Sequence, residues 1–268
     1  MRIGVFDSGF GGLTVLSELV RVLPRHDFVY LGDSARAPYG NRPREEVLSF
    51  TAQAVDFLAV QKCSVIIIAC NTASSEALRI IQQQIVPDKH PGLKVLGVLI
   101  PSAEAVAGKR YGAVGVIGTV GTVGSGSFQR EISKVAPETK VIASACPKLA
   151  GLIETGAGDG PEAENELRAC LELIVAGGAE ALILGCTHYP LVADKIRSML
   201  PLSVEVIDPP KLIAESFLKY LERHQEIRDG LSRLGMIQFF TTGSAKDFGE
   251  QGERFFGGKL GVVKQIRL

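Results

Sequence analysis

Short apolar runs alternate with longer amphipathic stretches along almost the whole chain. The runs are continuously apolar, which is typical of strands buried on both faces of a parallel sheet. The stretches between them carry apolar side chains at helical spacing, as at Val47, Phe50, Ala54 and Leu58. This order predicts an α/β fold of mainly parallel sheets flanked by helices. The expected strands are 2–6, 28–31, 65–69, 94–99, 113–117, 141–145, 181–184 and 204–207, with two more near the end of the chain, at an edge of the sheet.

Prolines indicate where the chain crosses between two parts. Proline resists both helix interiors and central strands, so the segments around Pro101 and Pro209 are expected to be crossing points. We therefore expect two α/β lobes, the first built from 1–98 plus 208–268 and the second from 99–207. Ligands bind beyond the carboxyl ends of the strands in such sheets, so two facing lobes would bring both sets of ends to one cleft.

Composition narrows the class of protein. Of the 268 residues, 46% are hydrophobic and 22% are charged, which is ordinary for a globular protein. Lys plus Arg and Asp plus Glu both number 29, so the charge favours neither nucleic acid nor an anionic membrane as a partner. No apolar run reaches the ~18 residues of a membrane span. The apolar start of the chain is too short for a signal peptide, so we expect a cytoplasmic protein.

The five cysteines favour neither a disulfide framework nor a zinc site, because they are few, odd in number and without a C-x-x-C pair. Two of them share a setting. Cys70 in "VIIIACNTAS" and Cys186 in "ALILGCTHYP" each end an apolar run and precede an expected helix start, whose dipole stabilises a thiolate. The repeat hints at internal duplication. The alternative for each is a buried structural thiol, which is how we interpret Cys63 and Cys170.

Three further segments follow expected strands and carry glycines or hydroxyls. "FDSGFGGLT" (6–14) could bind an anion or form a tight turn in which an acidic or hydroxyl side chain caps a helix. "GDSARAPYGNRP" (32–43) has the composition of a surface loop. "GVIGTVGTVGSGSF" (115–128) could hold a carboxylate or phosphate, or could simply cap helices. Glu154 is a lone acid in an otherwise small and apolar segment, so it is either at the surface or functional.

Together these motifs resemble those of a known enzyme family. "FDSGFGG", "LGDSARAPYG", "ACNTAS", "GTVGTVGSGSF" and "LGCTHYPL" are similar to the glutamate racemases of the cofactor-independent aspartate/glutamate racemase superfamily. The similarity runs from residue 3 to at least 210, and "GCTHYPL" favours the glutamate enzymes over their aspartate relatives. The resemblance implies two pseudosymmetric α/β lobes with the active site between them, no cofactor, no metal and a homodimer. Phe128 stands where the family has tyrosine, and we expect it to pack in a helix.

The resemblance also implies roles for individual residues. Cys70 and Cys186 would be the acid–base pair, with Asp7 assisting Cys70 and with Glu154 and His188 assisting Cys186. The substrate-binding positions would be Asp7, Ser8, Tyr39, Gly40, Asn71, Thr72, Thr119, Thr122, Thr187 and His188.

The chemistry of racemisation explains why such an enzyme would need two thiols. The reaction removes the α-proton from one face of glutamate and returns a proton to the other, so two bases on opposite sides can act without turning the substrate over. One must be a thiolate while the other is a thiol. An ordinary thiol pKa of about 8.5 puts both forms within reach near neutral pH. The resemblance further implies that the D-glutamate formed supplies peptidoglycan synthesis.

Other classes stay open at this point. A cysteine-nucleophile hydrolase would use Cys186 with His188, but it leaves the Cys70 motif without a role. A two-lobed binding protein for a small anion would explain the polar strand ends, but not two thiols. An aspartate racemase, or another two-cysteine amino-acid racemase, is the nearest enzymatic alternative.

Overall fold

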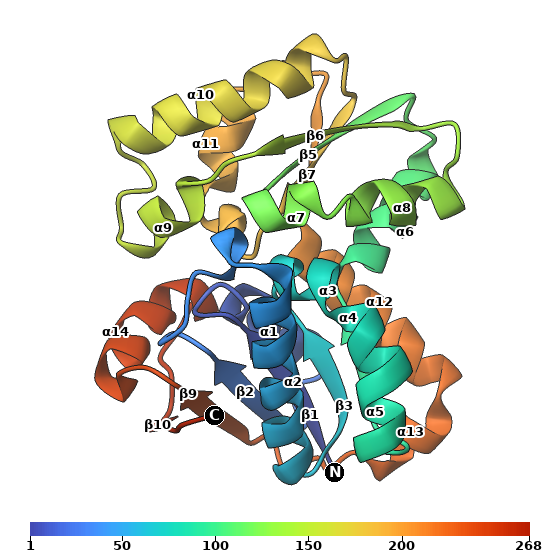
Figure 1. The fold of residues 1–268 in the computed structure, drawn as a ribbon, viewed down its shortest axis with the longest axis vertical. Helices are drawn as coiled ribbons and strands as arrows, with labels where there is room; N and C mark the ends of the chain where they lie inside the picture. Colours follow the sequence, from blue (N-terminus) through green and yellow to red (C-terminus); the bar gives the residue numbers. More distant parts are fainter.

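The computed structural model describes residues 1–268 and contains two parallel sheets, one in each lobe of the molecule (Figure 1). The six-stranded sheet of the first lobe has the order β10-β9-β2-β1-β3-β4, and the four-stranded sheet of the second lobe has the order β6-β5-β7-β8. The first contains β1 (Arg2–Asp7), β2 (Phe28–Gly32), β3 (Cys63–Ile68), β4 (Lys94–Gly97), β9 (Ile237–Thr241) and β10 (Val263–Gln265). The second contains β5 (Ala113–Gly118), β6 (Lys140–Ala145), β7 (Ala181–Gly185) and β8 (Glu205–Ile207).

Helices cover the sheets, as the repeating order of strand and helix requires. Those of the first lobe are α1 (Leu13–Val22), α2 (Arg44–Val60), α3 (Asn71–Glu76), α4 (Leu78–Ile80), α5 (Val86–Lys89), α12 (Pro209–Arg223), α13 (Gln225–Gly230) and α14 (Ala245–Phe256). Those of the second lobe are α6 (Leu99–Lys109), α7 (Val120–Gly124), α8 (Ser127–Val135), α9 (Leu149–Glu154), α10 (Pro161–Ala176) and α11 (Ala193–Ser198). None of them is both long and apolar enough to cross a membrane.

The predicted α/β fold is confirmed, and each expected strand is present with small shifts at its ends. The largest difference is at 94–99, where β4 ends at Gly97 because α6 begins at Leu99. Pro101 and Pro209 lie in the first turns of helices α6 and α12. A first-turn residue has no intrahelical partner for its N–H group, so proline is tolerated there.

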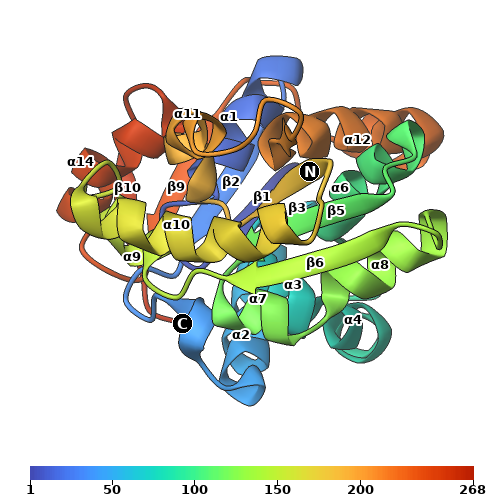
Figure 2. The same ribbon diagram turned by 90° about the horizontal axis from the view of Figure 1, so that it is seen from above.

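The two lobes share a core. The largest buried cluster includes Leu16 of α1 and Leu182 of β7, which belong to different lobes. Helix α12 packs against both α1 and α6, and so joins the lobes on one side (Figure 2). No strand of one sheet comes from the segments expected to form the other. The boundaries at residues 98 and 207 stay a prediction. Phe128 lies in α8 and is buried, which confirms the expectation that it packs in a helix.

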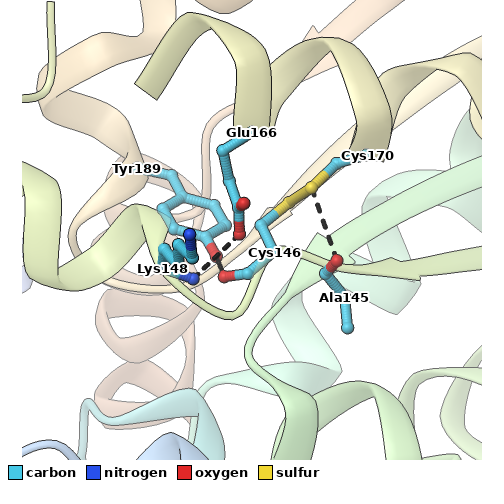
Figure 3. Close-up of a disulfide and its surroundings, with 6 residues drawn as sticks. All are labelled: Ala145, Cys146, Lys148, Glu166, Cys170 and Tyr189. Carbon is cyan, nitrogen blue, oxygen red and sulfur yellow. Dashed lines mark hydrogen bonds between the residues drawn. A yellow bond between two sulfur atoms is a disulfide. The ribbon is translucent and has the colours of Figure 1, made fainter. Parts of the chain in front are cut away.

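Cys170 differs from its expected state. It is joined to Cys146 in a disulfide that ties the segment after β6 to α10 (Figure 3). Cys170 is buried as expected, but its interpretation as a thiol is wrong, whereas Cys63 is a free, buried thiol. The two bonded cysteines are 24 residues apart, and neither has a motif around it, so only the packing of α10 on the sheet reveals the pair.

Candidate active site

The two strand-end cysteines line one cavity of about 40 Å³ at the junction of the lobes. Cys70 follows β3 and Cys186 follows β7, so each reaches the cavity from the carboxyl end of a strand in a different lobe. Both side chains are buried. The other predicted residues that line the cavity are Ser8, Tyr39, Gly40, Asn71, Thr72, Thr119, Glu154, Thr187 and His188.

Cys70 caps the N-terminus of α3. The Ala73 N–H group donates to Cys70 Sγ at 3.5 Å, and the Cys70 thiol donates to Ser8 Oγ at 3.4 Å. Burial, and after it the nearby negative charge of Asp7, raises the pKa of the Cys70 thiol to about 12. The expected helix start is present, but burial outweighs its effect, and Cys70 is a neutral thiol near pH 7.

Cys186 lies beside an imidazole that is itself held by an acid. His188 Nδ1 is 3.8 Å from Cys186 Sγ, and His188 Nε2 is 3.1 Å from Glu154 Oε2. Burial disfavours the charged ring, but the hydrogen bonds to Cys186 and Glu154 outweigh it and raise the pKa of His188 to about 10. The expected helix start after Cys186 is present, but it begins as a 3₁₀ helix, Tyr189–Val192, that continues directly into α11.

Asp7 lies behind the lining residues and connects the lobes. Its fully buried carboxylate accepts hydrogen bonds from the Gly9 N–H group at 3.0 Å and from the Thr187 hydroxyl at 3.3 Å. Burial raises the pKa of Asp7, and the positive charge of His188 opposes that rise. The resemblance placed Asp7 beside Cys70. In the structure its charge acts both on Cys70 and on His188, which lies beside Cys186.

The glycine-rich turn before α1 approaches the second lobe closely. A Cβ atom on Gly11 would lie 2.2 Å from Thr187 Oγ1 and 2.5 Å from His188 Nδ1. The Thr14 hydroxyl also donates to the Thr187 carbonyl at 3.2 Å. The lobes can therefore meet here only because residue 11 has no side chain. The alternative in which a side chain caps this helix is wrong, because the N-cap of α1 is Gly12, with no side-chain hydrogen bond.

Three threonine hydroxyls form a cluster across the junction. Thr72 Oγ1 is 2.9 Å from Thr119 Oγ1 and 3.3 Å from Thr122 Oγ1. Thr119 also caps α7 by accepting from the Thr122 N–H group at 3.2 Å, so the capping interpretation is confirmed, and the binding of a carboxylate or phosphate stays a prediction. Gly40 packs on this cluster, since a Cβ there would lie 2.6 Å from Thr119 Cβ. Thr122 itself lies behind the cavity lining.

Sequence reasoning missed Asp33, which fixes the loop that carries Tyr39. Its buried carboxylate accepts hydrogen bonds from Arg36 Nε at 2.7 Å, from the Thr242 hydroxyl at 2.7 Å and from the Tyr39 hydroxyl. The alternative of a plain surface loop is therefore wrong. The sequence did carry a signal for Asp33, because Asp7 and Asp33 each stand at the end of a strand and are each followed by a serine. Also missed were the lining residues Gly9, Ala37, Pro38, Ala150, Gly151 and Gly185.

Known proteins resemble this chain over nearly its whole length. The model of the Asp/Glu/Hydantoin racemase family matches residues 3–217. A glutamate racemase of Geobacter metallireducens is 38% identical and covers 99% of this chain and 96% of its own length. The crystal structure of glutamate racemase from Francisella tularensis in complex with D-glutamate has a TM-score of 0.89 at 32% identity, covering 99% of this chain and 97% of that one. A glutamate racemase isoform from Bacillus anthracis has a TM-score of 0.89 at 36% identity, covering 100% and 97%.

Proposed function

Because the chain belongs to the Asp/Glu/Hydantoin racemase family, a family of isomerases, we propose that it interconverts L-glutamate and D-glutamate. One observation carries the proposal: Cys70 and Cys186 reach a single cavity from two separate sheets. A reaction that works on both faces of one carbon needs a proton donor and acceptor on each side. Glutamate is favoured over other amino acids because proteins named glutamate racemase match nearly the full length of the chain.

In the direction from L- to D-glutamate, the proposed mechanism starts with Cys186 as the base and Cys70 as the acid. The positively charged His188 lies beside Cys186, whereas burial keeps Cys70 protonated. The Cys186 thiolate then removes the α-proton of L-glutamate, and the electron pair that is left behind delocalises into the α-carboxylate. Cys70 gives its proton to the opposite face, which yields D-glutamate. The reverse direction starts from the Cys70 thiolate, and this assignment of faces follows the family resemblance.

The donors around the cavity suit a substrate with two carboxylates. The hydroxyls of Ser8, Thr72 and Thr119 and the amide of Asn71 are neutral hydrogen-bond donors, so they can bind carboxylate oxygens without a cationic side chain. Donors fixed before the reaction also stabilise the negative charge that develops when the α-proton leaves. The proposed substrate-binding set is Asp7, Ser8, Tyr39, Gly40, Asn71, Thr72, Thr119, Thr122, Thr187 and His188.

The rival functions explain less of this geometry. In a cysteine-nucleophile hydrolase, Cys186 and His188 would act alone, and a second thiol on the same cavity would have no task. A binding protein would need the polar groups but neither thiol. An aspartate racemase would use the same machinery, so substrate comparison separates it from the proposal.

The wider setting follows from the same proposal. D-glutamate made in the cytoplasm supplies peptidoglycan synthesis, and the protein works as a homodimer, without nucleic acid or membrane as a partner. Light scattering at micromolar concentration tests the dimer, and a monomer mass with full activity would contradict its being required.

Circular dichroism tests the proposed reaction directly. The optical signal of pure L-glutamate, and separately of pure D-glutamate, should decay to zero in the presence of the protein. Aspartate, assayed under the same conditions, should lose its signal more slowly. A stable signal with both glutamate enantiomers refutes the proposed function, and faster decay with aspartate moves the chain to an aspartate racemase.

A further inference from the structure

A side chain of the first lobe reaches into the catalytic surroundings of the second. Arg254, in the last turn of α14, donates from Nη2 to the carbonyl oxygens of Ile153 at 2.6 Å and of Glu154 at 3.0 Å. These carbonyls end α9. Figures 1 and 2 both show α14 beside α9, although α14 packs on the first sheet. The last carbonyls of a helix have no intrahelical partner, so a cationic donor stabilises that end.

From Glu154 the contacts continue to a reacting sulfur. The Glu154 carboxylate has one hydrogen-bond partner, the Nε2 atom of His188, and the other ring nitrogen of His188 faces Cys186. The Glu154 side chain is 27% exposed, so packing alone does not fix it. Its direction depends on where the end of α9 lies, and Arg254 holds that end.

Phe255, the next residue of α14, supports the same group. Its ring is buried and meets the His188 ring edge-on, with the centroids 5.2 Å apart. The Arg254 guanidinium lies 5.2 Å from the centroid of the same phenyl ring. Helix α14 therefore contacts both the backbone that carries Glu154 and the ring that Glu154 orients.

We propose that Arg254 is a positioning residue for the acid–base centre of the second lobe, formed by Glu154, His188 and Cys186. Arg254 aligns Glu154 and His188 with Cys186 only when the lobes are closed. This inference rests on the proposed racemase function. The cavity of about 40 Å³ is far smaller than the pockets of about 300–1,000 Å³ that hold small-molecule ligands. The lobes must therefore separate to admit an amino acid. Closing brings Arg254 back onto α9 and completes the centre around the bound substrate.

Single-face elimination tests this role. β-Chloroglutamate needs only abstraction of its α-proton before it expels chloride, so each enantiomer reports one thiol. Arg254→Met keeps an unbranched stem over Phe255 and removes the donors. It should slow elimination from the L-analogue, which Cys186 serves, by roughly tenfold, as expected for loss of a charge-assisted hydrogen bond. Elimination from the D-analogue should stay within about twofold, and Arg254→Lys should recover part of the loss.

The matched control is Lys246→Met, which removes one exposed cation from the same helix without touching α9. It should keep both elimination rates. Equal slowing of both enantiomers by Arg254→Met would mean a merely structural role, and no slowing of either would also overturn the proposal. Wild-type protein inactive on both enantiomers would instead refute the racemase function.

A titration of His188 by NMR tests the positioning without any activity. Arg254→Met should lower the pKa of His188 from its raised value, because a displaced Glu154 stabilises the charged ring less. Lys246→Met should not change that pKa. An unchanged His188 titration in Arg254→Met would contradict the proposed coupling even if the wild-type reaction proved to be a different one.

Discussion

Replacing Gly11 by alanine tests how closely the lobes must meet. The new Cβ would lie 2.2 Å from Thr187 Oγ1 and 2.5 Å from His188 Nδ1, whereas non-bonded atoms keep about 3.5 Å apart. The turn and the second lobe must therefore separate by roughly 1 Å. A displacement of about 1 Å at a reacting centre can cost about a hundredfold in rate. Overpacking of this kind costs about 1–3 kcal/mol of stability.

We expect kcat/KM for racemisation by Gly11→Ala to fall about a hundredfold while the variant stays folded. Circular dichroism of the substrate gives the rate, and thermal unfolding gives the stability. Gly9→Ala in the same turn is the stability control, because the nearest atom to its Cβ would be Ala37 Cβ at 3.8 Å. If Gly11→Ala kept the kcat/KM of wild type, the reasoning that the close contact of Gly11 with Thr187 and His188 aligns the two sulfurs would be refuted.

Three further predictions follow from the site. The raised pKa of His188 means that its stabilising charge is fully present below about pH 6.5 and is lost as the pH rises through about 10. The stability advantage of wild type over His188→Asn should therefore shrink across that range in urea unfolding, and a constant advantage would count against the charged ring. Because the cavity is far smaller than ordinary ligand pockets, the lobes should open to admit the substrate and close on it. Amide hydrogens around Thr14 and Thr187 should therefore exchange more slowly with D-glutamate bound, and equal exchange rates would contradict opening. Racemisation should survive dialysis of the protein against a chelator, and the purified protein should show no pyridoxal phosphate absorbance. Loss of activity that is restored by adding a metal ion or pyridoxal phosphate would reject the two-thiol chemistry.

Local sequence was sufficient to predict the strands and the polar residues that follow their carboxyl ends. Continuous apolar runs can only be buried, and parallel strands end at one edge, so Cys70 and Cys186 could be expected to face a ligand from their positions alone. The conformation of the proline segments was harder to predict, because Pro101 fits a first helical turn as well as an irregular connection. Which of these applies depends on the residues packed around it.

Contacts distant in sequence were beyond local reasoning. Arg254 meets Glu154 from 100 residues away, and Cys170 meets Cys146 with no motif around either. The high pKa of the Cys70 thiol also depends on its burial in the folded chain and on the nearby charge of Asp7, so the helix start alone gave the wrong weight to the thiolate. Asp33 was within reach, since it repeats the strand–Asp–Ser pattern of the first strand.

The most direct test of two bases on two faces uses serine at each thiol in turn. Cys70→Ser and Cys186→Ser should both lose racemisation, because a hydroxyl is too weakly acidic to become the base near neutral pH. Cys70→Ser should still eliminate from L-β-chloroglutamate and fail with the D-enantiomer, and Cys186→Ser should show the reverse. Cys63→Ser, at a buried thiol away from the cavity, is the matched control and should racemise normally. Elimination from both enantiomers at equal rates by either active-site variant would contradict the assignment of one cysteine to each face.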